Sequence, residues 1–302
     1  MKHLLKLLDM SPAEMTEILD LADQLKYERK HGIEHPHLKG KALGMIFQKS
    51  STRTRVSFET GMYQLGGHAL FLSGRDLQIG RGEPVQDTAR VLSRYLDGIM
   101  IRTFDQKEVE DLAKYGSIPV INGLTDFCHP CQVLADLMTI REKFGGFSGL
   151  KLCYIGDGNN MANSLIVGGL KMGMKVSAAT PAAYRPDPSV LEFAAGYEGQ
   201  FLLTEEPEAA AAGADIVVTD TWASMGQEDE KEERKKVFQG YQVNHQLLSA
   251  ANPGVMVQHC LPAYRGQEIT EEVFEEHSQE IFDEAENRLH AQKAVLVKLL
   301  KK

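Results

Sequence analysis

The chain has 302 residues, enough for two domains of ordinary size. Its 33 Lys and Arg against 42 Asp and Glu give a formal charge of −9, which argues against partners that bind basic surfaces, namely nucleic acid and anionic membranes. A composition of 43% hydrophobic and 25% charged residues is typical of a globular protein and excludes wholesale disorder.

The four cysteines indicate a reducing cellular compartment and argue against a fold held together by disulfides. They are few and unevenly placed (Cys128, Cys131, Cys153 and Cys260), which fits reduced thiols better than a disulfide framework. No run approaches 18 apolar residues, and the first residues do not form a signal-peptide core. We therefore expect a cytoplasmic protein with no membrane segment.

The first half of the chain predicts alternating strands and helices. A capping box from Ser11 to Glu14, with Pro12 at the first helical position, begins a helix. Short apolar runs then predict strands at 42–47, 69–72, 98–101 and 118–121, with helices near 54–65, 85–96 and 107–115. This βαβ alternation is typical of a parallel sheet covered by helices.

The second half repeats the pattern after a long amphipathic helix over about 129–144. Strands are predicted at 150–155, 175–179, 201–203, 216–219 and 255–259, and a glycine-rich segment at 145–149 separates the two series. The last helix, about 284–300, could pack back on the first domain. The mixed-charge run 228–236 predicts a solvated helix face or a mobile loop. We expect an α/β protein with two parallel-sheet domains.

A polar cluster at 50–55 follows the first strand and begins a helix. Backbone N–H groups, four hydroxyls and a guanidinium converge there, and together they predict a phosphate-binding cradle. The alternative is an ordinary capped helix in which Arg55 pairs with Glu59. Capping explains one hydroxyl and leaves the others, so anion binding is favoured, although Arg55 itself can be structural.

The segment Cys128-His129-Pro130-Cys131-Gln132 begins the long helix and admits three interpretations. A redox pair would need a thioredoxin-like context, and a zinc site would need a second Cys/His pair; neither is evident in the sequence. The third interpretation has His129 and Gln132, three residues apart on one helical face, presenting polar groups to a ligand. By spacing alone, a structural histidine remains the commoner case.

Three further motifs follow strands of the second half. Gly156-Asp157-Gly158-Asn159-Asn160-Met161 invites a dinucleotide-binding interpretation, but Met161 replaces the third glycine, and the next strand ends without an acidic residue. Asp220 and Ser224 could bind an ammonium group at the end of another strand. Cys260 could be a nucleophile or a small buried hydrophobe, and no dedicated base for a thiolate mechanism is evident near it in the sequence.

Together these motifs resemble those of the aspartate/ornithine carbamoyltransferase family, in the family's order and over essentially the whole chain. The matching segments are Ser51-Thr52-Arg53-Thr54, Arg102, His129-Pro130-Cys131-Gln132, Asn160, Asp220 with Ser224-Met225-Gly226, His259-Cys260-Leu261-Pro262 and Arg288. The resemblance implies two doubly wound domains bridged by two helices. It assigns residues 1–140, with the helix 284–302, to carbamoyl phosphate and residues 141–283 to ornithine, in a homotrimer with shared active sites.

The reaction implied is transfer of the carbamoyl group of carbamoyl phosphate to the δ-amine of L-ornithine, giving citrulline and phosphate, with no cofactor and no metal. The implied carbamoyl phosphate ligands are Ser51, Thr52, Arg53, Thr54, Gln78 from a neighbouring subunit, Arg102, His129, Gln132, the Leu261 carbonyl and Arg288. The implied ornithine ligands are Asn160, Asp220, Ser224, Met225 and Cys260. Arg102, His129, Cys260 and Arg288 are the implied catalytic residues.

Other amine acceptors and a non-catalytic function are the alternatives. Family members that use aspartate carry a lysine in the loop occupied here by Gln78 and lack the Ser-Met-Gly and His-Cys-Leu-Pro segments. Acetylornithine or putrescine would leave Asp220 and Ser224 without the cation that they could bind. A ligand-binding regulator on the same fold that had lost catalysis would not need intact polar groups in both half-sites. This sequence has polar groups in both, which argues against a regulator.

Overall fold

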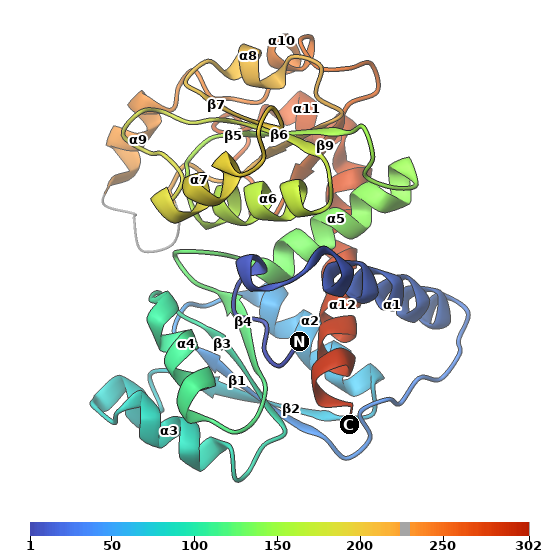
Figure 1. Cartoon of the computed structure of the whole chain (residues 1–302), viewed down its shortest axis with the longest axis vertical. Helices are drawn as coiled ribbons and strands as arrows, with labels where there is room; N and C mark the ends of the chain where they lie inside the picture. Colours follow the sequence, from blue (N-terminus) through green and yellow to red (C-terminus); the bar gives the residue numbers. More distant parts are fainter. Residues whose placement is uncertain (224–229, 302) are drawn as a thin grey trace. The chain divides into compact units, whose positions relative to one another are not determined.

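The computed structural model describes residues 1–223 and 230–301, and the chain divides into two compact units. Unit 1 comprises Met1–Met138 and Asn287–Lys302, and unit 2 comprises Thr139–Glu286. The chain passes from one unit to the other inside α5 (Pro130–Phe144) and again inside α12 (Ser278–Leu300) (Figure 1). The expected class, two parallel-sheet α/β domains joined through two helices, is confirmed.

Unit 1 contains a four-stranded parallel sheet in the order β2-β1-β3-β4. Its strands are β1 (Ala42–Phe47), β2 (His68–Ser73), β3 (Gly98–Arg102) and β4 (Val120–Leu124). Its helices are α1 (Pro12–Lys30), α2 (Thr52–Gln64), α3 (Val85–Leu92) and α4 (Gln106–Tyr115), with 3₁₀ turns η1 (Leu7–Asp9) and η2 (Gln78–Arg81). The capping box predicted before α1 is present: Ser11 caps Glu14, whose carboxylate accepts from the Ser11 backbone N–H.

Unit 2 contains a five-stranded parallel sheet in the order β7-β6-β5-β8-β9. Its strands are β5 (Lys151–Ile155), β6 (Lys175–Ala179), β7 (Phe201–Thr204), β8 (Ile216–Thr219) and β9 (Met256–His259). Its helices are α6 (Asn160–Lys171), α7 (Pro188–Ala195), α8 (Pro207–Ala211), α9 (Lys231–Val237), α10 (His245–Leu248) and α11 (Glu271–Glu276). None of the helices in the described part of the chain has the length and apolar character needed to cross a membrane.

The strand orders fix where ligands can bind. In unit 1 the chain winds outward from β1 to β2 and in the other direction from β3 to β4; in unit 2 it reverses between β5 and β8. Open parallel sheets leave a crevice at the carboxyl ends of the strands where the order reverses. The residues that follow β1, β3, β5 and β8 are therefore the ones that each sheet presents to a ligand.

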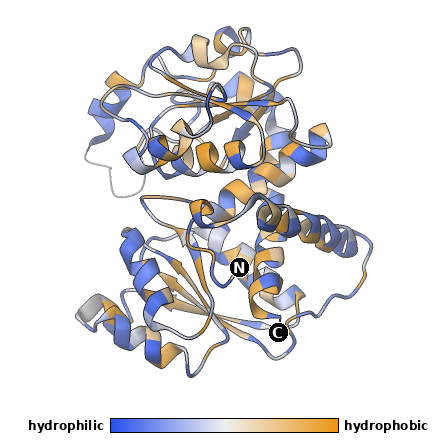
Figure 2. Ribbon diagram, in the orientation of Figure 1, coloured by the Kyte–Doolittle hydropathy of each residue, from blue (hydrophilic) through white to orange (hydrophobic). Residues whose placement is uncertain are grey.

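Each unit has its own hydrophobic core. The strands of both sheets are largely hydrophobic, whereas α4 is largely hydrophilic (Figure 2). In unit 1, Ile46, Ile99 and Ile101 of the sheet are fully buried and belong to one cluster with Val109 and Leu112 of α4. In unit 2, Ile155 and Val217 are buried in a second cluster that includes Phe238.

A buried lysine joins several segments of unit 1. Lys293, on α12, has no exposed surface, and its ammonium donates to the Leu25 carbonyl at 3.5 Å and to Gln64 Oε1 at 3.1 Å. Nε2 of His35 lies 3.0 Å away, while His35 Nδ1 lies 2.8 Å from the Ile33 carbonyl. A carbonyl can only accept, so the proton of His35 is on Nδ1, and Nε2 accepts from the lysine.

Candidate functional site

The loop after β1 and the first turn of α2 carry the hydroxyl cluster. Ser51 is the N-cap of α2: its Oγ accepts from the Thr54 backbone N–H at 3.2 Å. Thr54 is fully buried, and the first turn of the helix contains no acidic residue. The backbone N–H groups of such a first turn have no intrahelical acceptor and lie at the positive end of the helix dipole. This turn can therefore hold an anion.

Arg55 does not take part in that arrangement. Its Nε donates to Glu59 at 3.0 Å, and its guanidinium stacks on the ring of Phe71 at 3.8 Å. These contacts confirm the structural interpretation of Arg55.

Arg288 connects the start of α2 with the start of α5. Its Nη2 donates to Thr54 Oγ1 at 3.0 Å, and its Nη1 donates to Gln132 Oε1 at 2.8 Å. The amide of Gln132 in turn donates to Asp136 Oδ1 at 2.8 Å. Arg288 is 3% exposed. The structure thus brings together three predicted site residues, Thr54, Gln132 and Arg288, that lie far apart in the sequence.

His129, just before α5, lies in a strongly positive environment. Burial lowers the pKa of His129 well below its usual value, and the charges of Arg288, Arg102 and Arg53 lower it further. His129 is therefore neutral at neutral pH, and its ring offers one N–H donor and one acceptor nitrogen. Three guanidinium groups acting on one buried imidazole create a site suited to a ligand with more than one negative charge.

Arg102 ends β3 at the reversal point of the sheet. Its side chain is 9% exposed, and its carbonyl accepts from the backbone N–H of Gln48 at 2.9 Å, which ties the end of β3 to the loop after β1. In that loop the largely buried Lys49 pairs with Asp126 and lies 4.3 Å from the ring of Phe104. The motif analysis did not single out Lys49.

Gln78 lies in η2 and is exposed, and its carbonyl accepts from the Glu83 backbone N–H at 3.1 Å. Its exposure fits a function in a neighbouring subunit, which stays a prediction.

The thiols beside His129 are structural. Burial raises the pKa of Cys128 and of Cys131 to about 12, so both stay protonated at neutral pH. Cys131 Sγ donates to the Asn122 carbonyl at 3.4 Å, and Cys128 Sγ lies 3.5 Å from the Leu5 carbonyl. Redox exchange and zinc binding both require a thiolate. The ligand-presenting interpretation of this segment is the one that its surroundings favour.

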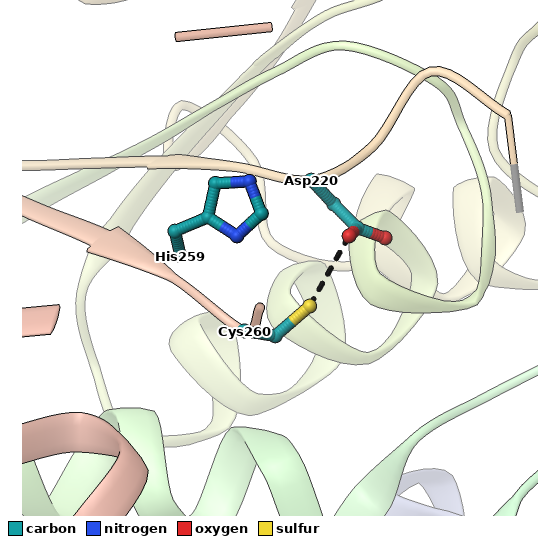
Figure 3. A group of neighbouring side chains, drawn as sticks. All are labelled: Asp220, His259 and Cys260. Atoms are coloured by element: carbon teal, nitrogen blue, oxygen red, sulfur yellow. Dashed lines mark hydrogen bonds between the residues drawn. The ribbon is translucent and has the colours of Figure 1, made fainter. Parts of the chain in front are cut away.

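In unit 2, Asp220 follows β8 and is held at both carboxylate oxygens. Asn159 Nδ2 donates to Oδ2 at 2.9 Å, and the Cys260 thiol donates to Oδ1 at 3.2 Å (Figure 3). Asn159 itself is fixed, because its Oδ1 caps α6 by accepting from the backbone N–H groups of Met161 and Ala162. Sequence reasoning singled out Asn160 and missed Asn159, although its position before a helix is typical of an N-cap.

His259 orders the segment that carries Cys260 and Leu261. Its Nδ1 accepts from the Leu261 backbone N–H at 2.9 Å, so its proton is on Nε2, which donates to the buried Glu268 at 3.1 Å. Leu261 adopts a positive φ of 58°, unusual for a residue other than glycine. Among the described residues, Asp220, His259 and Cys260 also offer donor atoms within 4.8 Å of one another, a spacing that a metal ion could use. Each of the three already has a hydrogen-bond partner, so the group is complete as a hydrogen-bonded network.

The glycine-rich turn after β5 has a packing explanation. A Cβ on Gly158 would lie 2.3 Å from the Arg185 carbonyl carbon, and the Gly158 N–H donates to the Tyr184 carbonyl at 2.9 Å. The close approach of two backbone segments thus requires glycine here, without any nucleotide. Asn160, 7% exposed, begins α6 next to this turn. Ser224 and Met225 lie outside the described residues.

Two family models match the chain. Residues 2–142 match the carbamoyl-P binding domain, and residues 148–299 match the Asp/Orn binding domain, of aspartate/ornithine carbamoyltransferase. An ornithine carbamoyltransferase of Pyrococcus abyssi is 56% identical over 99% of this chain and 96% of its own, and one of Thermococcus kodakarensis is 55% identical over 98% and 95%. The solved ornithine carbamoyltransferase of Pyrococcus furiosus superposes with a TM-score of 0.94 at 54% identity, covering 99% of this chain and 97% of that one.

Proposed function

We infer the reaction of this chain from its family: the chain belongs to the aspartate/ornithine carbamoyltransferase family, and it acts as a transferase. We propose that it moves the carbamoyl group of carbamoyl phosphate to the δ-amine of L-ornithine, giving citrulline and phosphate. Curated relatives that are 55–56% identical over nearly the full length bear the name ornithine carbamoyltransferase. No comparison favours aspartate, acetylornithine or putrescine as the acceptor, or a non-catalytic regulator.

The hydrogen bonds that join Arg288 to Thr54 and Gln132 are the observation that carries the proposal, and the charges of Arg53, Arg102 and Arg288 all act on the buried His129 nearby. Carbamoyl phosphate is a small dianion at neutral pH, and this group offers the positive charge that such a ligand needs. In our proposal the hydroxyls and N–H groups of Ser51 to Thr54 bind the phosphate with Arg53. Arg102, His129 and Thr54 donate to the carbamoyl oxygen, where negative charge grows during attack.

The carbamoyl NH₂ group is assigned to a second set of acceptors. Gln132 is held by Arg288 at 2.8 Å and would offer its amide oxygen to that group. We retain the Leu261 carbonyl as a further ligand of the NH₂ group, as the family resemblance implies. Catalysis in this scheme comes from alignment and electrostatics, because phosphate is a competent leaving group once its charge is neutralised.

The amine acceptor is assigned to unit 2. Asp220, with Ser224, would bind the α-ammonium of ornithine, and Asn160, with the Met225 backbone, would bind the α-carboxylate. Cys260 would lie beside the δ-amine. An aliphatic amine has an intrinsic pKa of about 10.4, so the δ-amine must lose a proton before it attacks. The Asp220–Cys260 contact at 3.2 Å supports a function of these two polar groups in that step.

We also propose the domain and assembly assignments that follow from this reaction. Residues 1–140 with 284–302 form the carbamoyl phosphate domain, and residues 141–283 form the ornithine domain. The enzyme is a cytoplasmic homotrimer in which Gln78 serves the active site of a neighbouring subunit. The exposed position of Gln78 supports this last assignment.

A carbamoyl-transfer assay tests the reaction. Purified protein, treated with a chelator and given carbamoyl phosphate, is offered ornithine, acetylornithine, putrescine and aspartate in parallel. Citrulline and phosphate should form in equal amounts with ornithine, without added metal or nucleotide. A clear preference for any of the other three amines would refute the assignment of the acceptor.

Subunit complementation tests the shared site. Inactive Gln78→Ala chains are mixed with inactive Arg102→Ala chains under conditions that allow subunit exchange. Hybrid interfaces that pair an intact Gln78 with an intact Arg102 should recover part of the citrulline formation. Verified exchange with no recovery would place Gln78 in its own subunit's site or in none.

A further inference from the structure

A nearly buried ion pair lies next to the Asp220 group in unit 2. Arg234, on α9, donates from Nη1 to Asp157 Oδ2 at 2.8 Å. The side chains of the two residues are only 6% and 8% exposed. Arg234 stands in the mixed-charge run that the sequence predicts to be a solvated helix face or a mobile loop. For this residue the prediction is wrong, because the guanidinium turns inward.

The same guanidinium binds a second turn. Its Nη1 also donates to the Trp222 carbonyl at 2.9 Å, its Nε donates to Glu230 at 2.9 Å, and its plane lies 4.6 Å from the ring of Tyr184. Asp157 belongs to the turn after β5, and Trp222 belongs to the turn after β8. Arg234 therefore joins, by hydrogen bonds, the two turns that follow β5 and β8 at the point where the strand order reverses.

These two turns carry the Asn159–Asp220 hydrogen bond. Asn159 comes two residues after Asp157, and Asp220 comes two residues before Trp222. Asn159 Nδ2 donates to Asp220 Oδ2 at 2.9 Å, so the two turns are joined twice, once by Arg234 and once by Asn159. Any shift of one turn relative to the other must change the direction in which the Asp220 carboxylate points.

We propose that Arg234 is a positioning residue for the amine acceptor: by holding Asp157 and the Trp222 carbonyl together, it lets Asn159 aim the Asp220 carboxylate at the α-ammonium of ornithine. The inference rests on the proposed function of Asp220. Arg234 does not touch the substrate in this scheme. Its effect falls on ornithine affinity and leaves the carbamoyl phosphate half unchanged.

The energetics of the pair favour a positioning function over a purely stabilising one. Desolvating two charges offsets most of their attraction, so buried ion pairs are weak contributors to stability when compared with apolar side chains of similar volume. What such a pair provides is fixed geometry, because the buried Asp157 carboxylate loses its charge compensation if the two side chains separate.

The charge state of the pair also depends on pH in a useful range. Burial raises the pKa of Asp157 to about 6, the charges of Asp220 and Glu230 add to that rise, and the charge of Arg234 opposes it. Below that pH Asp157 becomes neutral, and the link that Arg234 makes between the two turns weakens.

Steady-state kinetics with three variants test the inference. Arg234→Gln removes the charge and the Nη1 group that donates to both turns, and Asp157→Asn keeps the shape and removes the partner charge. Lys235→Gln on the same helix removes an exposed pair with Glu232 and serves as the matched control. At pH 8, Arg234→Gln and Asp157→Asn should each raise the KM for ornithine about tenfold or more. The KM for carbamoyl phosphate should stay within twofold and kcat at saturating ornithine within threefold. Lys235→Gln should match the wild type, and Arg234→Lys should recover part of the lost affinity.

The pH profile separates positioning from a general loss of structure. The ratio of the ornithine KM in Asp157→Asn to that in the wild type should fall toward one between pH 8 and pH 5, because the wild type then loses the same charge. An ornithine KM within twofold of wild type, equal rises in both KM values, or a ratio independent of pH would each overturn the inference. If Arg234→Gln does not fold, the isosteric Asp157→Asn decides alone. A wild type that makes no citrulline refutes the proposed function as well. An active wild type with unaffected variants refutes only the positioning function of Arg234.

Discussion

Lys293 gives the free energy of unfolding a component that grows as the pH rises. Burial lowers the pKa of Lys293 from 10.5 to about 8, the charge of Arg29 lowers it further, and Glu28 partly compensates. The folded protein therefore releases this proton before the unfolded chain does. Between about pH 8 and pH 10.5 the unfolded chain binds more protons than the folded protein does. The contribution of Lys293 to the free energy of unfolding therefore rises with pH in this range. The pKa of Lys293 in the unfolded chain, 10.5, exceeds that in the folded protein, about 8, by 2.5 units. At 1.36 kcal/mol per pKa unit, this difference amounts to about 3 kcal/mol.

Three buried thiols oppose this trend in the wild type. Burial raises the pKa values of Cys128, Cys131 and Cys153 from 9.0 to about 12, so the unfolded chain loses these protons first as the pH rises above 9. Each thiol lowers the free energy of unfolding by about 2 kcal/mol at pH 10.5 and by up to about 4 kcal/mol near pH 12. Their sum exceeds the lysine component, and total stability should fall above pH 9. Only a comparison between variants isolates Lys293.

The assay is equilibrium urea unfolding of the wild type and Lys293→Met, under reducing conditions, at several values from pH 8 to pH 10.5. Both proteins carry the same thiols, so the difference between their free energies should rise by about 2.5 kcal/mol over this range in favour of the wild type. Lys298→Met, which removes a partly exposed lysine of the same helix, serves as the control for the loss of a lysine from α12. A Lys293 difference that stays constant within about 0.5 kcal/mol would refute the assigned charge state of this lysine.

Three further outcomes are expected. Arg102→Gln should lower kcat by about 10²- to 10³-fold, the typical effect of losing one donor to a developing oxyanion, and turnover within threefold of wild type would contradict that function. A thiol reagent at pH 8 should label Cys260 first, since a pKa of about 12 instead of 9.0 leaves the thiols of Cys128, Cys131 and Cys153 about 10³-fold less thiolate; fast labelling that persists in Cys260→Ser would contradict it. Ser11→Ala should lower the free energy of unfolding by about 1 kcal/mol in denaturant titrations without changing kcat, and an unchanged stability would show that the capping box is dispensable.

Local pattern was sufficient to predict the sheets, because their strands are apolar runs, and all but the edge strands β2 and β7 are largely buried on both faces. The strand predicted at 118–121 is β4 at Val120–Leu124, shifted because Asn122 and Gly123 interrupt the apolar pattern inside the strand. The helix predicted at 85–96 ends at Leu92, and its remaining residues form turns that continue the helical spacing of apolar side chains. Element boundaries depend on hydrogen bonds that spacing alone does not reveal.

The candidate site could be predicted only as far as single motifs extend. Strand ends and helix starts identified Thr54 and Asp220, because an open parallel sheet places ligands there, whereas Arg102 was identified by the family resemblance. The contacts that orient these residues come from distant parts of the chain. Arg288 and Gln132 are 156 residues apart, and Arg234 and Asp157 are 77 apart. No local pattern in a charged run distinguishes the one arginine that turns inward from the lysines that stay in solvent.

The discontinuity of unit 1 has a consequence for biosynthesis. Its first segment ends at Met138, but Thr54 and Gln132 receive their hydrogen bonds from Arg288, and His35 and Gln64 receive theirs from Lys293. The ribosome must add residues 139–286, which is 148 residues, before the segment that begins at Asn287 can emerge. At about 5 to 20 residues per second this takes roughly 7 to 30 s, during which unit 2 is free to fold while the earlier-made unit lacks part of its core. The half of the polypeptide translated first is therefore the last to reach its final hydrogen bonding, and it is the half that loss of the final residues would damage.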